Sequence, residues 1–206
     1  FLLRIDLLIP TKIFLHLSHT SLLSKWIRQN SKHKFNDYYT PVLEYNKRHQ
    51  LFEHVIDQYI KDAPIDYLEF GVSKGGSFRW WVQHIKNPES RFYGFDTFTG
   101  LQEAWGVYKV GDMGNGNEPP KIDDNRHAFY QGLFQQTLLG FLSTYKVGKP
   151  KVIHMDADIY SSTLYVLTLI TPFLHKGDII LFDEFNVPMH EFKAFTEWTQ
   201  SFYIDY

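Results

Sequence analysis

The feature that most constrains the fold is an alternation, after Pro64, of short apolar runs with stretches of helical periodicity. Five of the runs have the length of a strand: IDYLEFGV, RFYGFD, HAFYQG, KVIHMDAD and DIILFDEF. Most are followed by a stretch that can form a helix, and this alternation is typical of βαβ units. We therefore expect an α/β fold built around a parallel sheet.

Length, composition and charge indicate one main domain that binds small molecules. The chain has 206 residues, of which 44% are hydrophobic and 21% are charged, as in ordinary globular domains. Its net charge of -2 gives no basic excess, so we expect no nucleic-acid partner. The absence of cysteine excludes disulfides and thiolate zinc sites and agrees with a reducing compartment, so we expect a cytoplasmic protein.

The opening stretch, FLLRIDLLIPTKIFLHLSHTSLLSKWIRQ, is the one candidate for a membrane segment in the sequence. Arg4, Asp6, Pro10 and Lys12 interrupt it, so no run approaches the roughly 18 to 20 apolar residues of a spanning helix. We expect no membrane partner. The stretch instead predicts an amphipathic helix that packs on the domain or on a second subunit of a homo-oligomer.

Residues 22–60 show helical spacing of apolar side chains, with one stripe formed by Leu51, Val55, Ile56 and Tyr59. We therefore divide the chain into a helical extension, residues 1–62, and an α/β domain, residues 63–206. The extension is expected to act as a lid or as an oligomer contact.

Residues 101–125 are rich in Gly, Asn, Asp and Pro and have little periodicity, which predicts a long loop. A loop of this length is often a lid or a binding loop, although surface disorder is as common. Trp105 and Tyr108 within this polar sequence favour a lid that closes on a ligand.

A glycine-rich turn follows the first apolar run, in the sequence EFGVSKGGS. Glycines let the backbone approach a ligand, and the N–H groups at the start of the next helix can bind an anion. Lys74 precedes the glycine pair, so the turn is not a P-loop, and the spacing G-x-x-x-G-G differs from the dinucleotide motif G-x-G-x-x-G. A plain tight turn is the structural alternative.

The second apolar run ends in Asp96, about 25 residues after Gly71, where an acid can accept hydrogen bonds from both hydroxyls of a ribose. Alone, Asp96 could equally form a turn. Together, Glu69, Gly71 and Asp96 predict a nucleoside site at the carboxyl ends of the first two strands.

Four acids follow the last two apolar runs: Asp156, Asp158, Asp183 and Glu184. If these strands are neighbours, the carboxylates converge and repel one another unless a cation lies between them. A hard divalent cation such as Mg²⁺ takes oxygen ligands of this kind. The alternative is that some of the acids cap a helix, as Asp158 could before SSTLYVL.

The segments EFGVSKGGS, GFDTFTGLQEAW, QGLFQQTL, HMDADIYSST and GDIILFDEF together resemble the macrocin O-methyltransferase family. Members of that family methylate sugar hydroxyls on antibiotics and related glycosides. The resemblance runs from Tyr67 to Trp198 in the expected order. It implies a Rossmann-like, doubly wound, mostly parallel sheet with helices on both faces, and S-adenosylmethionine as the methyl donor.

The resemblance also implies roles for individual residues. Those expected to bind S-adenosylmethionine are Glu69, Gly71, Ser77 and Asp96, with Gln131, Gly132 and Phe134 bordering the adenine. Asp156, Asp183 and Glu184 would bind the metal, although Asp is common in the family where Glu184 stands. Asp158 would be the catalytic base.

These expectations define an O-methyltransferase that methylates a hydroxyl of a sugar or another small natural product with help from Mg²⁺. His127 and His154 are alternative bases, although His154 lies in an apolar run and is more simply a core histidine. The family's fold ends with an antiparallel strand pair, and FYIDY predicts an incoming strand, so the domain is expected to be truncated there. A non-catalytic relative and a nicotinamide-dependent oxidoreductase remain as rivals.

Overall fold

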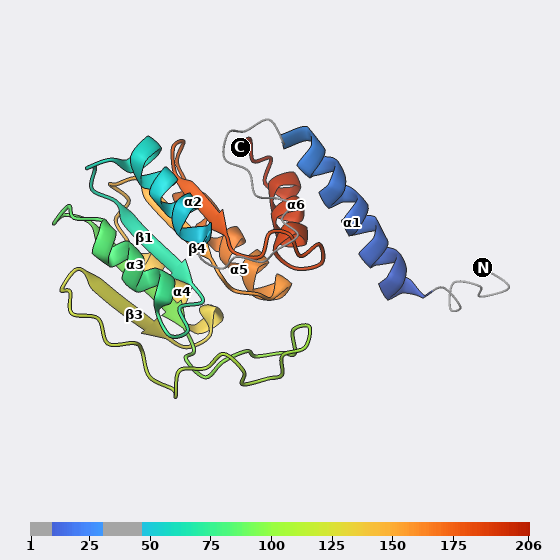
Figure 1. The fold of residues 1–206 in the computed structure, drawn as a ribbon, viewed down its shortest axis with the longest axis horizontal. Coiled ribbons are helices and arrows are strands. Elements are labelled where there is room, and N and C mark those ends of the chain that lie inside the picture. The colour runs from blue at the N-terminus through green and yellow to red at the C-terminus, as the bar shows by residue number, and fades with distance from the viewer. Residues whose placement is uncertain (1–9, 31–46) are drawn as a thin grey trace.

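The structure is a computed structural model that describes residues 10–30 and 47–206 (Figure 1). The strands are β1 (Asp66–Phe70), β2 (Arg91–Asp96), β3 (His127–Gln131), β4 (Lys151–Met155) and β5 (Ile179–Phe182). The α-helices are α1 (Thr11–Asn30), α2 (Lys47–Val55), α3 (Gly76–His84), α4 (Phe134–Thr144), α5 (Tyr160–Ile170) and α6 (Glu191–Ser201). Two short elements are the π-helix η2 (Ile56–Ile60) and the 3₁₀-helix η3 (Thr171–Phe173).

The five strands form one parallel sheet in the order β3-β2-β1-β4-β5. Each strand lies within one of the five predicted runs, so the predicted α/β fold is confirmed. The strand order reverses between β1 and β4, and in open sheets of this kind ligands bind at the carboxyl ends beside such a reversal.

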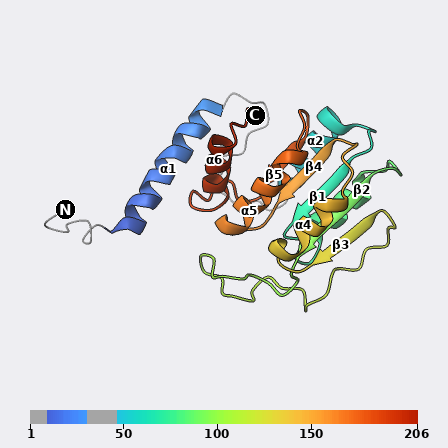
Figure 2. The ribbon, with the colours of Figure 1, turned by 180° about the vertical axis from the view of Figure 1, so that it is seen from behind.

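Helices cover both faces of the sheet, as predicted. α2 and α3 lie over one face in Figure 1, and α4, α5 and α6 lie over the other in Figure 2. Side chains of β1 alternate between two cores: Tyr67 packs in a cluster with Trp81 of α3, whereas Leu68 packs in a cluster with Leu138 of α4. The sheet is therefore buried on both sides, which explains its nearly continuous apolar strands.

The predicted stripe of residues 51–59 is wrong at its last position. Tyr59 is 69% exposed, whereas Ile60 is buried in the same cluster as Val55. The N–H of Lys61 donates to the carbonyl of Ile56, an i→i+5 bond that widens the turn. The wider turn brings Ile60, and not Tyr59, onto the face that Val55 occupies.

The two described helices that precede β1 both contact the rest of the fold. α1 lies beside α6 in both views, and a cavity of about 460 Å³ is lined by residues of both, Trp26 and Phe192 among them. α2 belongs to the core, because Phe52 packs in the cluster that contains Trp81. Residues 1–9 of the opening stretch lie outside the described residues. No helix among those described is long and apolar enough to cross a membrane.

The strand predicted from FYIDY is wrong, because residues 202–206 are a turn and irregular chain. The N–H of Ile204 donates to the carbonyl of Thr199, which folds the chain back onto the end of α6. The ring of Tyr206 packs on Phe195, and its hydroxyl accepts a 2.8 Å hydrogen bond from Trp26 Nε1.

Candidate active site at the carboxyl ends of the strands

The glycine turn begins where β1 passes closest to the end of β4. Gly71 has a φ of 101°, in the region that favours glycine, and a Cβ added there would overlap the backbone carbonyl oxygen of Asp156. Gly71 is therefore required for the approach of the two strand ends. The sequence motif indicated only the approach of a ligand to this glycine and gave no sign of its contact with the end of β4.

The buried side chain of Glu69 stabilises the glycine turn. Its carboxylate is fully buried and accepts a 2.7 Å hydrogen bond from the Ser77 hydroxyl and a second one from the Tyr67 hydroxyl. Ser77 lies in the first turn of α3, so Glu69 ties the end of β1 to the start of that helix. Direct contact of Glu69 or Ser77 with a cofactor stays a prediction.

Asp96 organises the same turn from β2. One carboxylate oxygen accepts a hydrogen bond from the N–H of Ser73 and the other from the N–H of Phe98, both at 2.6 Å. Burial raises the pKa of Asp96, and these N–H donors partly offset that rise. Each oxygen of a carboxylate has a further lone pair, so the bonds leave acceptors for a ribose.

The residues predicted to border the adenine follow β3, beside Asp96. The N–H of Gly132 donates a 2.9 Å hydrogen bond to the carbonyl of Asp96, and Gln131 Nε2 donates to the carbonyl of Asn117. Phe134, the first residue of α4, packs edge-on against Phe70 at a ring distance of 5.5 Å. These residues therefore line the same edge of the sheet.

The predicted lid loop folds across the glycine turn. The Ser73 hydroxyl donates a 2.8 Å hydrogen bond to the carbonyl of Met113, and a Cβ on Gly75 would lie 2.7 Å from the Pro120 ring. At its far end the loop reaches α6, because Trp105 packs edge-on against His190. These contacts favour a lid, and closure on a ligand stays a prediction.

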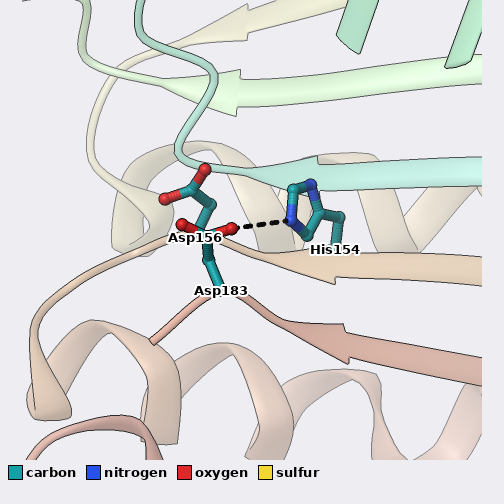
Figure 3. Close-up of side chains that lie close together, drawn as sticks. All are labelled: His154, Asp156 and Asp183. Atoms are coloured by element: carbon teal, nitrogen blue, oxygen red, sulfur yellow. Dashed lines mark ion pairs between the residues drawn. The ribbon is translucent and has the colours of Figure 1, made fainter. Parts of the chain in front are cut away.

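Three side chains that could hold a metal ion converge between β4 and β5 (Figure 3). His154, Asp156 and Asp183 each offer one ligand atom, and these atoms lie within 4.8 Å of one another. His154 belongs to β4, and the two acids directly follow β4 and β5. The convergence expected for Asp156 and Asp183 follows from the pairing of these strands.

Glu184, the third predicted ligand, lies outside this group of converging atoms. Burial first, and then Asp158 and Asp183, raise its pKa to about 7, so it still belongs to the same acidic region. Its Oε2 is buried without a hydrogen-bond partner among the described residues. Glu191 was not among the predicted site residues; it is a buried residue of α6 that accepts a 2.8 Å hydrogen bond from the N–H of Glu184.

An arginine of α2 forms ion pairs with the acids. Arg48 Nη2 lies 2.9 Å from Asp183 Oδ2, and Nη1 lies 3.8 Å from Asp156 Oδ2. Burial, followed by the charge of Asp183, raises the pKa of Asp156. Burial pushes the pKa of Asp183 in the same direction, but His154 and Arg48 outweigh it and leave that pKa lowered. Arg48 was not among the predicted site residues, because only the fold brings α2 to the strand ends.

His154 connects the metal acids to the glycine turn. It is buried, its Nδ1 lies 3.2 Å from the Tyr67 hydroxyl, and its Nε2 lies 3.8 Å from Asp183 Oδ1. Burial lowers its pKa, but the carboxylates of Asp183 and Glu69 raise it more strongly, to about 10. The two-residue alternation of β4 places His154 on the face of Asp156, which is the signal that could have identified it.

Asp158, the predicted base, follows β4 two residues after Asp156. Its φ of 55° is uncommon for a residue other than glycine, and such backbone is often found at active sites. Burial, followed by the charges of Asp183 and Asp96, raises its pKa to about 6. A carboxyl group with this pKa is well suited to accept a proton near neutral pH.

A Rossmann-like sheet with a glycine turn after β1, an acid after β2 and acids after β4 and β5 defines a class of nucleoside-cofactor enzymes. Residues 68–185, more than half of the chain, match the family described as a methyltransferase domain. The chain belongs to this family. Family membership confirms the predicted methyltransferase and implies S-adenosylmethionine as its methyl donor.

Solved structures of O-methyltransferases share the fold. The O-methyltransferase NovP is 19% identical with a TM-score of 0.60, and the match covers 94% of this chain and 92% of that one. The calicheamicin methyltransferase CalS11 is 22% identical with a TM-score of 0.56, covering 92% and 84%. A second, apo structure of CalS11, described as a TDP-rhamnose 3'-O-methyltransferase, is 23% identical with a TM-score of 0.53, covering 88% and 84%. No curated protein matches the chain.

Proposed function

We propose that the protein is an S-adenosylmethionine-dependent O-methyltransferase that methylates a hydroxyl of a sugar or another small natural product with help from a divalent cation. The observation that carries the proposal is the state of Asp158, which follows β4 with a φ of 55° and whose pKa is raised to about 6 by burial and by the charges of Asp183 and Asp96. A base in this position can serve a hydroxyl held between the cofactor and the metal. The description of CalS11 as a TDP-rhamnose 3'-O-methyltransferase supports a sugar as the acceptor.

The residues after β1 and β2 fit S-adenosylmethionine. Asp96 retains lone pairs for the two ribose hydroxyls while its N–H donors fix its orientation. The start of α3 has no acidic residue in its first turn, so its free N–H groups can face the carboxylate of the methionine part. We propose Gly71, Ser77, Gln131, Gly132 and Phe134 as further cofactor-binding residues, with Glu69 acting through Ser77.

The residues after β4 and β5 fit a hard divalent cation. Asp156 and Asp183 supply carboxylate oxygens within reach of each other, and the Glu184 Oε2 atom is buried without a partner among the described residues. Oxygen ligands of this kind favour Mg²⁺. We propose Asp156, Asp183 and Glu184 as ligands, and the side chain of Glu184 would have to turn toward the other two.

The bound groups and the side chains of the protein supply different parts of the methyl-transfer reaction. When bound, S-adenosylmethionine would supply an electrophilic methyl group, and a cation held by Asp156, Asp183 and Glu184 would polarise the attacking hydroxyl. Asp158 accepts the hydroxyl proton as the new O–CH₃ bond forms and the S–CH₃ bond breaks, with its electron pair remaining on sulfur. Asp96 and the glycine turn fix the donor in line with the acceptor, and the loop over the turn shields both from water.

Calorimetric titration of the purified chain tests the cofactor and the metal separately. We expect micromolar binding of S-adenosylmethionine, no binding of NAD, and a heat of Mg²⁺ binding that disappears in Asp156→Asn. Binding of NAD in place of S-adenosylmethionine would favour the oxidoreductase. Binding of S-adenosylmethionine without methyl transfer to any hydroxyl acceptor would indicate a non-catalytic relative.

We also propose that residues 1–62 act as a helical extension that contacts a second subunit. Support comes from α1, on which Ile13, Phe14 and Leu17 are more than half exposed. The packing of Phe52 in the domain core limits such a contact to the part of the extension before α2. Sedimentation of the chain with and without Leu17→Glu measures the contribution of this face to an oligomer.

A further inference from the structure

Arg48 places a fixed positive charge against two of the acids proposed as metal ligands. Its Nη2 lies 2.9 Å from Asp183 Oδ2, and its Nη1 lies 3.8 Å from Asp156 Oδ2. The three side chains are shielded, with 17% of Arg48, 11% of Asp183 and 23% of Asp156 exposed. Solvent screening of this ion pair is therefore weaker than on an open surface.

The guanidinium of Arg48 and a divalent cation cannot both bind these acids without a large electrostatic repulsion. Arginine stays protonated in proteins, so its charge cannot be removed to admit a second cation. Two positive charges a few ångströms apart repel strongly in a shielded site. A metal that binds Asp156 and Asp183 therefore has to displace the Arg48 head group from Asp183.

The attachment of Arg48 allows such a displacement. The residue lies one position after the first residue of α2, and the helix is anchored farther along by Phe52 and Val55 in the core. Its neighbour His49 stacks on Trp80 at a ring distance of 5.6 Å. The long side chain can swing away while these contacts hold the rest of α2.

We infer that Arg48 is an internal counter-ion that holds Asp183 in the metal-free protein and competes with the divalent cation for it. This inference rests on the metal site of the proposed function. It makes Arg48 a positioning residue: the metal-free acids keep a countercharge and their arrangement, and cation binding frees the Arg48 side chain from Asp183.

The test is a titration of the full chain with Mn²⁺, comparing the wild type with Arg48→Gln. We expect the variant to bind Mn²⁺ at least about tenfold more tightly, because no charge-assisted hydrogen bond to Asp183 has to be broken. Without metal the variant should unfold at a lower temperature, and saturating Mn²⁺ should raise that temperature more than in the wild type. Lys86→Gln removes the same charge at an exposed position and should change neither quantity.

Nuclear magnetic resonance of the Arg48 guanidinium in the wild type gives a second readout that needs no variant. Saturating Mg²⁺, which is diamagnetic, should shift the Arg48 Nε–H resonance toward that of a solvated arginine and leave the amide resonances of Phe52 and Val55 unchanged. Equal or weaker Mn²⁺ binding by Arg48→Gln, or an Arg48 resonance that metal binding does not shift, overturns the role of Arg48 and leaves the metal site standing. Absence of Mn²⁺ binding in both proteins overturns the metal site and the competition with it.

Discussion

The N–H of Ser73 donates a 2.6 Å hydrogen bond to the carboxylate of Asp96, which joins the glycine turn after β1 to the end of β2. The second carboxylate oxygen of Asp96 binds the N–H of Phe98 at the start of the loop. One acid thus fixes the turn, the loop and the proposed ribose contact together.

Replacing Asp96 with alanine should weaken S-adenosylmethionine binding roughly tenfold to 100-fold. The variant loses the ribose acceptors, and the N–H groups of Ser73 and Phe98 lose their partner. Calorimetry of the variant measures the change. Asp123→Asn, at an exposed position of the loop, is the matched control and should bind the cofactor like the wild type. Unchanged affinity in Asp96→Ala would contradict the proposed ribose site.

Gly71→Ala should lower the free energy of unfolding by about 3 kcal/mol, because the new Cβ would overlap the Asp156 carbonyl and φ is positive. Thermal or denaturant unfolding measures the loss. Gly140→Ala is the matched control. Gly140 lies within α4, and a Cβ added there would point into open space. This substitution should stabilise the protein by about 0.5–1 kcal/mol. Similar effects of the two substitutions would show that the close approach of β1 and β4 is unimportant.

Arg126 caps the carboxyl end of α3, and its replacement by lysine should destabilise the protein. Its guanidinium donates to the carbonyls of Val82 and Ile85 and pairs with both oxygens of Asp124. Lysine cannot reproduce this fork, so Arg126→Lys should lower the free energy of unfolding by about 1–3 kcal/mol. Arg91→Lys is the control, because Arg91 is exposed, and its effect in the same denaturant titration should be small.

The same contact predicts a dependence of stability on pH. The hydrogen bond from Arg126 lowers the pKa of Asp124 below its usual value, so the ionised form stabilises the fold. This contribution is fully present above about pH 4 and is lost as pH falls through the folded-state pKa. The stability gap between wild type and Asp124→Asn should therefore be largest near neutral pH and shrink in acid. A gap independent of pH would argue against the ion pair.

The sequence predicts the fold well because the strands are buried on both faces and stand out as apolar runs. Periodicity failed where the backbone departs from a regular helix, as at Tyr59, where an i→i+5 bond shifts the buried position to Ile60. It also failed at the chain's last residues, where the Ile204 N–H caps α6 instead of extending a strand.

The candidate site is predictable only in part. Asp156 and Asp183 could be paired from the sequence, since acids that follow neighbouring parallel strands meet at one edge. The role of Arg48 could not be predicted from the sequence. Arg48 lies 135 residues before Asp183, and their contact depends on how α2 packs against the sheet. The burial of Glu69 beneath the turn likewise depends on tertiary packing around Tyr67 and Ser77.

We propose above all that Asp158 accepts the proton of a hydroxyl that is methylated from S-adenosylmethionine. The most direct test measures formation of S-adenosylhomocysteine and of a methylated product from glycoside acceptors, in the wild type and in Asp158→Asn. We predict turnover by the wild type and a rate lower by about 10²- to 10⁴-fold in the variant, with cofactor and metal affinities unchanged. Full activity of Asp158→Asn, or methylation that leaves every hydroxyl unchanged, would contradict the account.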